Sequence, residues 1–234
     1  MKDLHNHLLY GIDDGSVDIE QSITILNKLE NEGVTEIVLT PHYIIGTDYN
    51  ANNELKSKLL SSLQSKTNIK LYLGNEVFID NDIPDYIAKN EISTINNSRY
   101  LLIEFSLHAK MPFIAEIIFE LCKKGIIPII AHPERYLYYS IDDIKLFIES
   151  GCLLQGNITS LMNKYGKKVK KRLIKLLKAN LITVLGTDTH SNNNINIEDC
   201  LKELKKIVPE DKYNKLIDDN FTKIVNNISI RDDL

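Results

Sequence analysis

Short apolar segments alternate with amphipathic segments along the chain. The short segments are bounded by turn residues and predict seven strands: Asp3–His5, Glu36–Thr40, Lys70–Gly74, Tyr100–Glu104, Ile127–Ala131, Leu153–Gly156 and Thr183–Gly186. Between them, apolar residues recur at spacings of three and four, which is typical of helices that pack one face against a sheet. The alternation predicts an α/β fold with a parallel sheet and crossover helices.

Capping residues indicate where the helices begin and end. Ser16 or Asp18 can cap a first helix, and Gly33 can end it in a left-handed conformation. Further helices are predicted at Asn53–Ser65, Pro112–Lys124, Asp142–Ser150, Leu161–Ala179, Glu198–Ile207 and Asp211–Val225. No linker-like segment interrupts the pattern, so we expect residues 1–234 to form a single domain.

Composition and charge exclude several classes of protein. Apolar residues make up 43% of the chain and charged residues 26%, which excludes a largely disordered protein. With 28 Lys and Arg against 32 Asp and Glu, the net charge of −4 disfavours nucleic acid as a partner. No apolar run reaches the roughly 18 residues of a membrane span. The three cysteines lack the spacing of a thiolate zinc site, so we expect reduced thiols in a cytoplasmic protein without membrane insertion.

The segment Lys164–Lys178 contains eight lysines and arginines. It could bind phosphate, but Val169 and Leu173 belong to an apolar side at helical spacing, which favours a helix with a solvated basic face. The asparagine-rich segments Asn50–Asn53 and Ser191–Asn196 are predicted to be loops.

Residues that can bind metal gather at the predicted strand ends. In a barrel of parallel strands, functional groups lie at the C-terminal ends of the strands. Six of the seven predicted ends carry His, Asp or Glu, and Asp14 lies in the turn Gly11–Gly15. The nine candidate ligands are His5, His7, Asp14, His42, Glu76, Glu104, His132, Asp188 and His190.

These candidates predict a cluster of metal ions. Imidazole and carboxylate without thiolate suit Mn, Fe or Zn, and nine ligands exceed what one ion can use. His5 and His7 stand two residues apart on a strand, so both side chains point to one face. Glu76 and Glu104 end apolar segments, where a cation would offset the cost of burying a carboxylate.

Three further features bear on the chemistry. Arg135 follows His132 by three residues and can donate two parallel hydrogen bonds to phosphate, or form a salt bridge at the rim. His108 lies away from the predicted strand ends and is expected to be a loop residue or a substrate contact. No cysteine is followed six residues later by arginine, which disfavours cysteine-dependent phosphatase chemistry.

The order of these motifs resembles the polymerase and histidinol phosphatase (PHP) superfamily. The motifs are His5-x-His7, Gly11-Ile12-Asp13-Asp14-Gly15, Thr40-Pro41-His42, Gly74-Asn75-Glu76, Ile103-Glu104-Phe105, Ala131-His132-Pro133-Glu134-Arg135 and Gly186-Thr187-Asp188-Thr189-His190. More narrowly, the opening motifs together with Ala-His-Pro-Glu-Arg are similar to the bacterial CpsB/YwqE-type tyrosine-protein phosphatases of capsule and exopolysaccharide systems. The resemblance runs from Met1 to about His190.

This resemblance implies a distorted seven-stranded (β/α)7 TIM-like barrel, the PHP fold, that holds three divalent ions. Manganese is the preferred ion, and iron or zinc are alternatives. By analogy, the first ion would be bound by His5, His7, Glu76 and Asp188, the second by Glu76, Glu104 and His132, and the third by Asp14, His42 and His190.

The resemblance also implies roles in catalysis. Arg135 matches the family's phosphate-side, substrate-binding arginine, and Asp14 and His42 are expected to act with it in catalysis. The family often carries another arginine five residues after its last ligand histidine. Here that position is Ile195, so phosphate binding is expected to differ at this point.

The implied reaction is hydrolysis of a phosphomonoester by a metal-bridging hydroxide. Phosphotyrosine is the expected substrate, because a phenol with a pKa of about 10 leaves more readily than an alkoxide. The implied partner is a phosphotyrosine protein, namely a bacterial tyrosine kinase of polysaccharide biosynthesis. The alternatives are a small-molecule PHP phosphatase such as histidinol-phosphatase, a PHP 3′ to 5′ nuclease, which the net charge disfavours, and a catalytically inactive metal-binding module.

Overall fold

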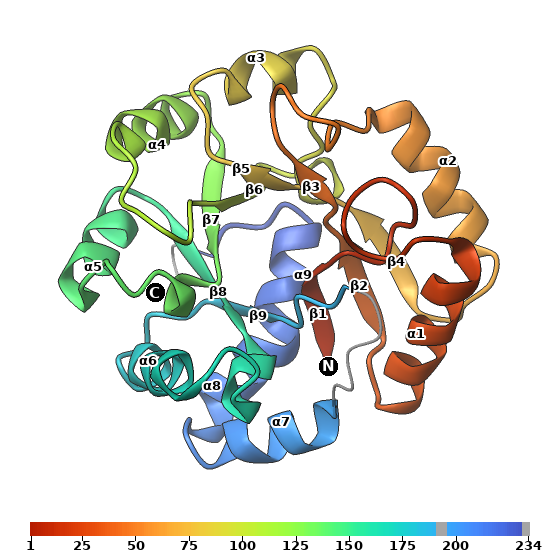
Figure 1. Cartoon of the computed structure of the whole chain (residues 1–234). Coiled ribbons are helices and arrows are strands. Elements are labelled where there is room, and N and C mark those ends of the chain that lie inside the picture. Colours follow the sequence, from red (N-terminus) through yellow and green to blue (C-terminus); the bar gives the residue numbers. More distant parts are fainter. Residues whose placement is uncertain (191–195, 231–234) are drawn as a thin grey trace.

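The structure is a computed structural model that describes residues 1–190 and 196–230. The strands in these ranges are β1 (Lys2–Asn6), β2 (Glu36–Leu39), β3 (His42–Tyr43), β4 (Lys70–Leu73), β5 (Glu76–Phe78), β6 (Tyr100–Glu104), β7 (Ile127–Ala131), β8 (Leu153–Asn157) and β9 (Val184–Gly186). The helices are α1 (Ile19–Asn31), α2 (Asn53–Gln64), α3 (Ile83–Ala88), α4 (Ile114–Lys123), α5 (Ile141–Glu149), α6 (Lys167–Lys178), α7 (Ile197–Lys205), α8 (Glu210–Asn214) and α9 (Asn220–Val225). Figure 1 shows the strands near the centre with most helices around them.

The strands form a curled parallel sheet with helices outside it, which confirms the predicted α/β class. One set of strands has the order β1-β2-β4, and the other has the order β3-β5-β6-β7-β8-β9. Every pairing between neighbouring strands of the described residues is parallel. The two sets meet where β1 lies beside β9, since Asp188 N donates to His5 O and His7 N donates to Thr189 O, both at 2.8 Å.

The described residues contain nine strands where the sequence predicts seven, because β3 and β5 lie just beyond the C-terminal ends of two predicted strands. The dipeptide Thr40-Pro41 separates β2 from β3, and Gly74-Asn75 separates β4 from β5. Pro41 has no N–H to donate to a neighbouring strand, which suits the break between β2 and β3. Beyond the interruptions, β3 and β5 pair His42 with Glu76 in register, which brings two candidate ligands side by side.

The helix α6 begins at Lys167 rather than at the predicted Leu161. Asn163 and Gly166 have φ angles of 61° and 89°, in the left-handed region that an α-helix does not use, and Ile158–Met162 forms a separate 3-10 turn. The helix α3 is not predicted by the sequence pattern. The predicted loop Ser191–Asn196 lies outside the described residues except for Asn196, whose side chain caps α7 by accepting from Asp199 N.

Apolar side chains pack on both faces of the curled sheet. On β6, Leu101 and Ile103 belong to the cluster that packs against the surrounding helices, while Tyr100 and Leu102 belong to a second, smaller cluster. This alternation follows from the two-residue period of a strand. The second cluster includes Phe221 of α9, so the helix fills the concave side of the sheet, and Figure 1 shows α9 near the centre of the ring of strands.

No helix of the described residues is long and apolar enough to cross a membrane.

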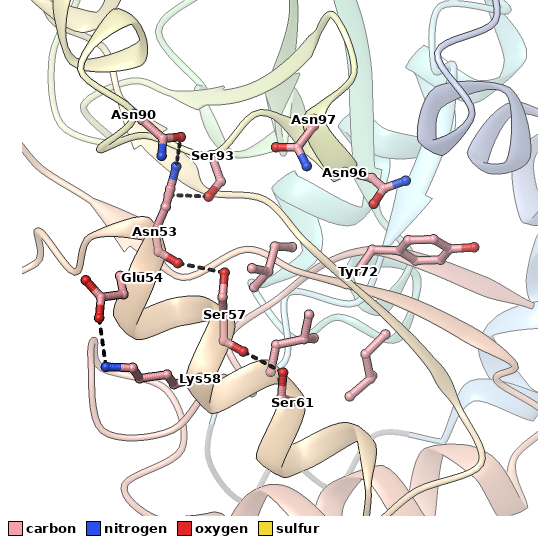
Figure 2. A pocket seen from close by; sticks show the side chains of 13 residues that line it. Asn53, Glu54, Ser57, Lys58, Ser61, Tyr72, Asn90, Ser93, Asn96 and Asn97 are labelled. Atoms are coloured by element: carbon pink, nitrogen blue, oxygen red, sulfur yellow. Dashed lines mark hydrogen bonds and ion pairs between the residues drawn. The ribbon is translucent and has the colours of Figure 1, made fainter.

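A groove of about 910 Å³ lies between α2, β4 and the segment 90–97, and none of the nine candidate ligands lines it. Its polar groups largely bond to one another, since Asn53 Nδ2 donates to Asn90 Oδ1 at 2.8 Å and Ser93 Oγ donates to Asn53 Oδ1 at 2.5 Å (Figure 2). The chemistry predicted from the sequence is therefore not in this groove.

Candidate metal centre

The candidate ligands converge at the C-terminal ends of the strands. Three groups of side chains have ligand atoms within 4.8 Å of one another: His5, His7 and Glu76; His42, Glu76 and Glu104; and His7, Asp14, His42 and His190. The groups share His7, His42 and Glu76, so they form one continuous cluster. Strands far apart in sequence thus bring their ends together, as expected for a barrel of parallel strands.

The deepest group joins His5, His7 and Glu76. His5 Nε2 lies 3.1 Å from His7 Nε2, so the two imidazoles on β1 and just after it point the same way, as their spacing predicts. Glu76 Oε2 lies 3.0 Å from His5 Nε2 and 3.2 Å from His7 Nε2. All three side chains are almost fully buried. Two imidazole nitrogens and a carboxylate oxygen facing one point are a suitable ligand set for a divalent ion.

The second group is centred on the two glutamates. His42 Nδ1 lies 3.3 Å from Glu76 Oε2 and 3.2 Å from Glu104 Oε1. His132, which the resemblance assigns to this ion, contacts the other oxygen of the same carboxylate, with His132 Nε2 at 2.8 Å from Glu76 Oε1. Glu76 therefore faces four imidazoles and occupies the position expected of a bridging ligand.

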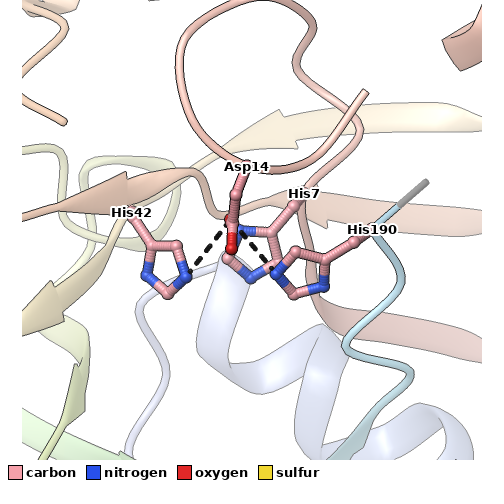
Figure 3. Close-up of side chains that lie close together, drawn as sticks. All are labelled: His7, Asp14, His42 and His190. Atoms are coloured by element: carbon pink, nitrogen blue, oxygen red, sulfur yellow. Dashed lines mark ion pairs between the residues drawn. The ribbon is translucent and has the colours of Figure 1, made fainter. Parts of the chain in front are cut away.

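The third group lies at the rim. Asp14 Oδ1 is 3.3 Å from His190 Nε2 and 3.6 Å from His42 Nε2, and Figure 3 shows Asp14 between these two imidazoles with His7 behind. The rings of His7 and His190 stack with centroids 3.9 Å apart. The side chain of Asp14 is 51% exposed and that of His190 is 26% exposed, so this group is open to a substrate while the deepest group is not.

Charge separation inside the cluster is strong. The Glu76 carboxyl has a pKa well below its usual value: burial alone would raise it, but His5 and His42 outweigh that effect. The pKa of Asp14 falls to about 2, chiefly through its hydrogen bond with His190. The pKa of His7 rises well above its usual value, because Asp13 and Glu76 overcome the opposing effect of burial. The carboxyl groups of Glu76 and Asp14 thus remain anionic at neutral pH, which suits cation binding.

The buried polar atoms of the cluster that lack hydrogen-bond partners fit metal ions. His42 Nδ1 is buried and makes no hydrogen bond among the described residues, although carboxylate oxygens of Glu76 and Glu104 lie close to it. His5 Nε2 and His7 Nε2 face each other at 3.1 Å, and at most one of them can donate to the other. Buried polar atoms without partners are rare in proteins and call for an explanation. Divalent ions among these nitrogens and oxygens provide one.

Asp188 is held in place by three donors. Its Oδ2 accepts from Asn157 Nδ2 at 2.7 Å, Tyr165 Oη at 2.8 Å and Arg135 Nη1 at 3.1 Å. Its Oδ1 instead lies 3.7 Å from His7 Nε2, 3.8 Å from His5 Nε2 and 3.4 Å from His190 Nδ1. One oxygen is thus fixed by the protein and the other faces the cluster.

The residues that orient the ligands were not predicted from the sequence. Asp13 Oδ2 lies 2.8 Å from His7 Nδ1, and Gln155 Oε1 lies 2.8 Å from His5 Nδ1. Such partners fix which ring nitrogen is free for a metal. The strand β8 is the one predicted strand whose end carries no candidate ligand. Its polar residues Gln155 and Asn157 stand in an otherwise apolar strand, and this pattern could have indicated residues that orient the ligands.

Backbone geometry marks two of the candidates. His132 and Asp188 have φ angles of 35° and 52°, in the left-handed region that non-glycine residues seldom adopt. Strained conformations of this kind concentrate at functional sites. Gly186 lets β9 approach β1 closely, since a Cβ atom there would lie 2.6 Å from His5 Cβ.

The other residues singled out in the sequence lie at or outside the edge of the cluster. Arg135 ends the 3-10 turn Pro133–Arg135 that follows β7 and His132, and its guanidinium contacts Asp188 at this edge. His108 is an exposed loop residue between β6 and α4 and belongs to none of the three groups. Ile195 lies outside the described residues. The three cysteines form no disulfide within the described part of the chain, as expected.

The fold and the site together define an α/β protein with a candidate multi-metal centre at the ends of its parallel strands. Comparison with protein families gives the more specific result. The chain belongs to the family "Capsular polysaccharide synthesis, CpsB/CapC", whose model matches residues 1–226.

Relatives and a solved structure agree with this assignment. The chain is 37% identical to a Staphylococcus aureus protein provisionally named tyrosine-protein phosphatase CapC, over 83% of this chain and 78% of that protein. It is 30% identical to the tyrosine-protein phosphatase YwqE of Bacillus subtilis, over 88% and 84%. A solved structure from work on YwqE of Bacillus subtilis and CpsB of Streptococcus pneumoniae, described as unique metal-dependent tyrosine phosphatases, superimposes with a TM-score of 0.87 at 27% identity. That match covers 98% of this chain and 96% of the other.

Proposed function

We propose that this protein is a metal-dependent tyrosine-protein phosphatase that hydrolyses the phosphomonoester of phosphotyrosine. The observation that carries the proposal is the convergence of buried imidazoles and carboxylates on Glu76, in a chain of the CpsB/CapC family. The relatives named above are tyrosine-protein phosphatases, which favours this activity over that of a small-molecule PHP phosphatase. A nuclease activity has no observation in its favour.

The proposed metal ligands are the nine residues predicted from the sequence. His5, His7, Glu76 and Asp188 would hold one ion, Glu76, Glu104 and His132 a second, and Asp14, His42 and His190 a third. The three geometric groups support this division in part: His7 and His42 are each shared by two groups, and His132 and Asp188 join the cluster only through their contacts with Glu76 and with the imidazoles. Three ions with manganese preferred, and iron or zinc as alternatives, are consistent with nitrogen and oxygen ligands.

Ions bound there would lower the pKa of water toward about 7 and neutralise charge on the phosphate oxygens. The chain's own residues set the conditions for this chemistry. The burial of His5, His7 and Glu76 excludes bulk water from the deep side of the centre. Asp14 and His42 lie toward the exposed rim, where we propose that they act on the reacting ester.

Arg135 is the proposed phosphate-binding residue. Its side chain is 22% exposed and lies at the edge of the cluster, where Asp188 Oδ2 holds it at 3.1 Å. The guanidinium has five N–H groups, so donors remain for phosphate oxygens in the transition state. A tyrosine leaving group requires less assistance than a serine alkoxide, which favours phosphotyrosine.

We also propose a barrel architecture, a single domain, a cellular location and a partner for the protein. A distorted barrel of seven strands, in which β2 continues into β3 and β4 into β5, is supported by the contact of β1 with β9 and by the pairing of β5 with β6. A single domain is supported by an apolar cluster that runs from Leu8 to Leu216. A cytoplasmic location is supported by the cysteines, which form no disulfide among the described residues and so suit a reducing compartment. The proposed partner is a phosphotyrosine protein such as a bacterial tyrosine kinase.

The test is phosphate release from a phosphotyrosine peptide by the manganese-loaded protein. We expect EDTA to abolish it and Asp188→Asn to lower kcat/KM by about a hundredfold or more. Asp142→Asn, an equal change of charge at a side chain that is 86% exposed, serves as the control and should leave the rate unchanged. Activity that persists in EDTA would contradict the proposal, and faster turnover of histidinol phosphate than of the peptide would favour the small-molecule alternative.

A further inference from the structure

Lys164 is a cation beside the candidate metal centre that the proposed function does not use. It is the first residue of the basic segment, but it precedes α6 and belongs to the connection between β8 and α6. Its side chain is exposed, and its Nζ donates a hydrogen bond to the backbone oxygen of Asp188 at 3.1 Å. Lys164 therefore reaches the strand end that carries a candidate ligand, unlike the lysines of a purely solvated helix face.

Lys164 and Arg135 are held together by an aromatic ring. Arg135 Cζ lies 4.5 Å from the centroid of the Tyr165 ring, and Lys164 Nζ lies 5.0 Å from the same centroid. Cations at these distances are attracted to the ring electrons. The hydroxyl of Tyr165 is fixed in turn by its hydrogen bond to Asp188 Oδ2. Tyr165 thus positions two cations at one edge of the centre.

The charges around this pair are not balanced. In the described part of the chain, Asp188 is the only carboxylate that forms an ion pair with Arg135, and none forms one with Lys164. The same carboxylate also faces His5, His7 and His190. Two neighbouring cations, of which only Arg135 is paired with a carboxylate, repel each other, and a bound anion would relieve this repulsion.

Both cations have N–H groups that form no hydrogen bond among the described residues. A lysine ammonium has three N–H groups and an arginine guanidinium has five. Among the described residues, Lys164 uses one bond to Asp188 O and Arg135 uses one to Asp188 Oδ2. A guanidinium can bind two oxygens of an oxyanion in parallel, while an ammonium acts as a point charge.

We propose that Lys164 and Arg135 form one anion subsite at the edge of the metal centre, which binds oxygens of the phosphate group in the substrate and in the released product. The proposal rests on the proposed function and adds Lys164 as a substrate-binding residue to it. Tyr165 is a positioning residue, because it acts through the two cations and Asp188.

The experiment measures binding of inorganic phosphate to the manganese-loaded protein by calorimetry. Lys164→Met should raise the Kd for phosphate about five- to tenfold, whereas Lys164→Arg should stay within about twofold. Lys178→Met is the matched control, since Lys178 is exposed at the far end of α6 and the change in net charge is the same. On a phosphotyrosine peptide, the KM of Lys164→Met should rise by a similar factor while kcat changes little, and its manganese content should be unchanged.

Three results would overturn the subsite: no binding of phosphate by the unchanged protein, an unaltered Kd in Lys164→Met, or a loss of manganese that accounts for the weaker binding. The last would show that Lys164 only supports the backbone of Asp188. Failure of the proposed function gives a different result, because a protein that binds phosphate through Lys164 but does not hydrolyse the peptide contradicts the activity alone. Hydrolysis with an unaltered Kd in Lys164→Met contradicts the subsite alone.

Discussion

Asp188 shows how one side chain is prepared for its proposed role. Three donors from three segments fix Oδ2, and Oδ1 is left to face the imidazoles. The residue also has a φ of 52°, so its backbone is held in the left-handed conformation, which costs free energy for a residue other than glycine. The surrounding hydrogen bonds offset this cost. A ligand held in this way needs little reorganisation when an ion binds.

Tyr165→Phe tests this arrangement at a single hydroxyl. Removing the donor 2.8 Å from Asp188 Oδ2 should weaken manganese binding by about tenfold, because outer partners of a metal ligand commonly affect its affinity to this extent. The metal affinity is measured by titration of the metal-free protein. Tyr213→Phe is the control, since Tyr213 lies on α8, away from the strand ends that carry the candidate ligands. Equal manganese affinity in the two variants would mean that Tyr165 does not position Asp188.

At this scale, the sequence predicted the candidate ligands but not their partners. His5 and His7 could be found because a strand places residues two apart on one face. Gln155 and Tyr165 could not be assigned, because their hydrogen bonds reach His5 and Asp188 across strands and loops that are distant in sequence. The binding of metal by all nine residues stays a prediction.

Helix α2 carries a lysine that its sequence pattern does not explain. Lys56 is fully buried, with Nζ 2.5 Å from Asn75 Oδ1 and 3.4 Å from the backbone oxygen of Glu91. No carboxylate in the described part of the chain forms an ion pair with it. Burial lowers the pKa of Lys56 to about 7. The helix therefore packs a group that folding tends to deprotonate, directly beside the Gly74-Asn75 interruption.

The stability of the protein should therefore depend on pH through Lys56. Since the pKa is about 7 in the folded chain and 10.5 for a lysine in water, the unfolded chain binds more protons between these values, and stability rises with pH there. Lys56→Met should remove this rise, which amounts to roughly 1 kcal/mol per pH unit. Urea unfolding at about pH 6.5, 8 and 9.5 measures the difference, with Lys58→Met on the exposed face of α2 as the control. Parallel pH profiles for the original protein and Lys56→Met would refute the prediction.

The elements were predicted to different degrees. The strands follow from short apolar segments, and α1 begins after its predicted cap Asp18. The predicted start of α6 was wrong because left-handed Asn163 and Gly166 precede the helix, and an apolar pattern carries no information on φ. The small strands β3 and β5 exist only because each pairs with the other and β5 also pairs with β6.

At the scale of the whole molecule, the metal centre and the apolar core are separate sources of stability. The core clusters consist of side chains beneath and outside the strand ends, and they contain none of the candidate ligands. The cluster of imidazoles and carboxylates lies at one edge of the curled sheet and joins β1, β3, β5 and β6. Metal binding should hence stabilise the folded chain without being required for it.

Chelation should lower the melting temperature while the fold persists. Removing one ion present at about a hundred to a thousand times its Kd costs about 3 to 4 kcal/mol, which corresponds to a decrease of about 5 to 15 °C for a chain of this length, and the loss of further ions adds to this decrease. Far-UV circular dichroism at room temperature should be unchanged, because the apolar clusters stay intact. EDTA already saturated with manganese is the control. A melting temperature that EDTA does not alter would indicate that no ion binds the folded chain.

The sequence by itself determined the α/β class, the positions of the main strands along the chain and the residue types of the candidate site, because periodicity and strand-end position are local properties. Only the tertiary structure decided that Glu76 faces four imidazoles, that Lys164 lies before the basic helix and donates to Asp188, and that α9 fills the concave side of the sheet. These features depend on how strands and loops curl around one another. Such long-range contacts arise when the chain packs, and no short segment encodes them.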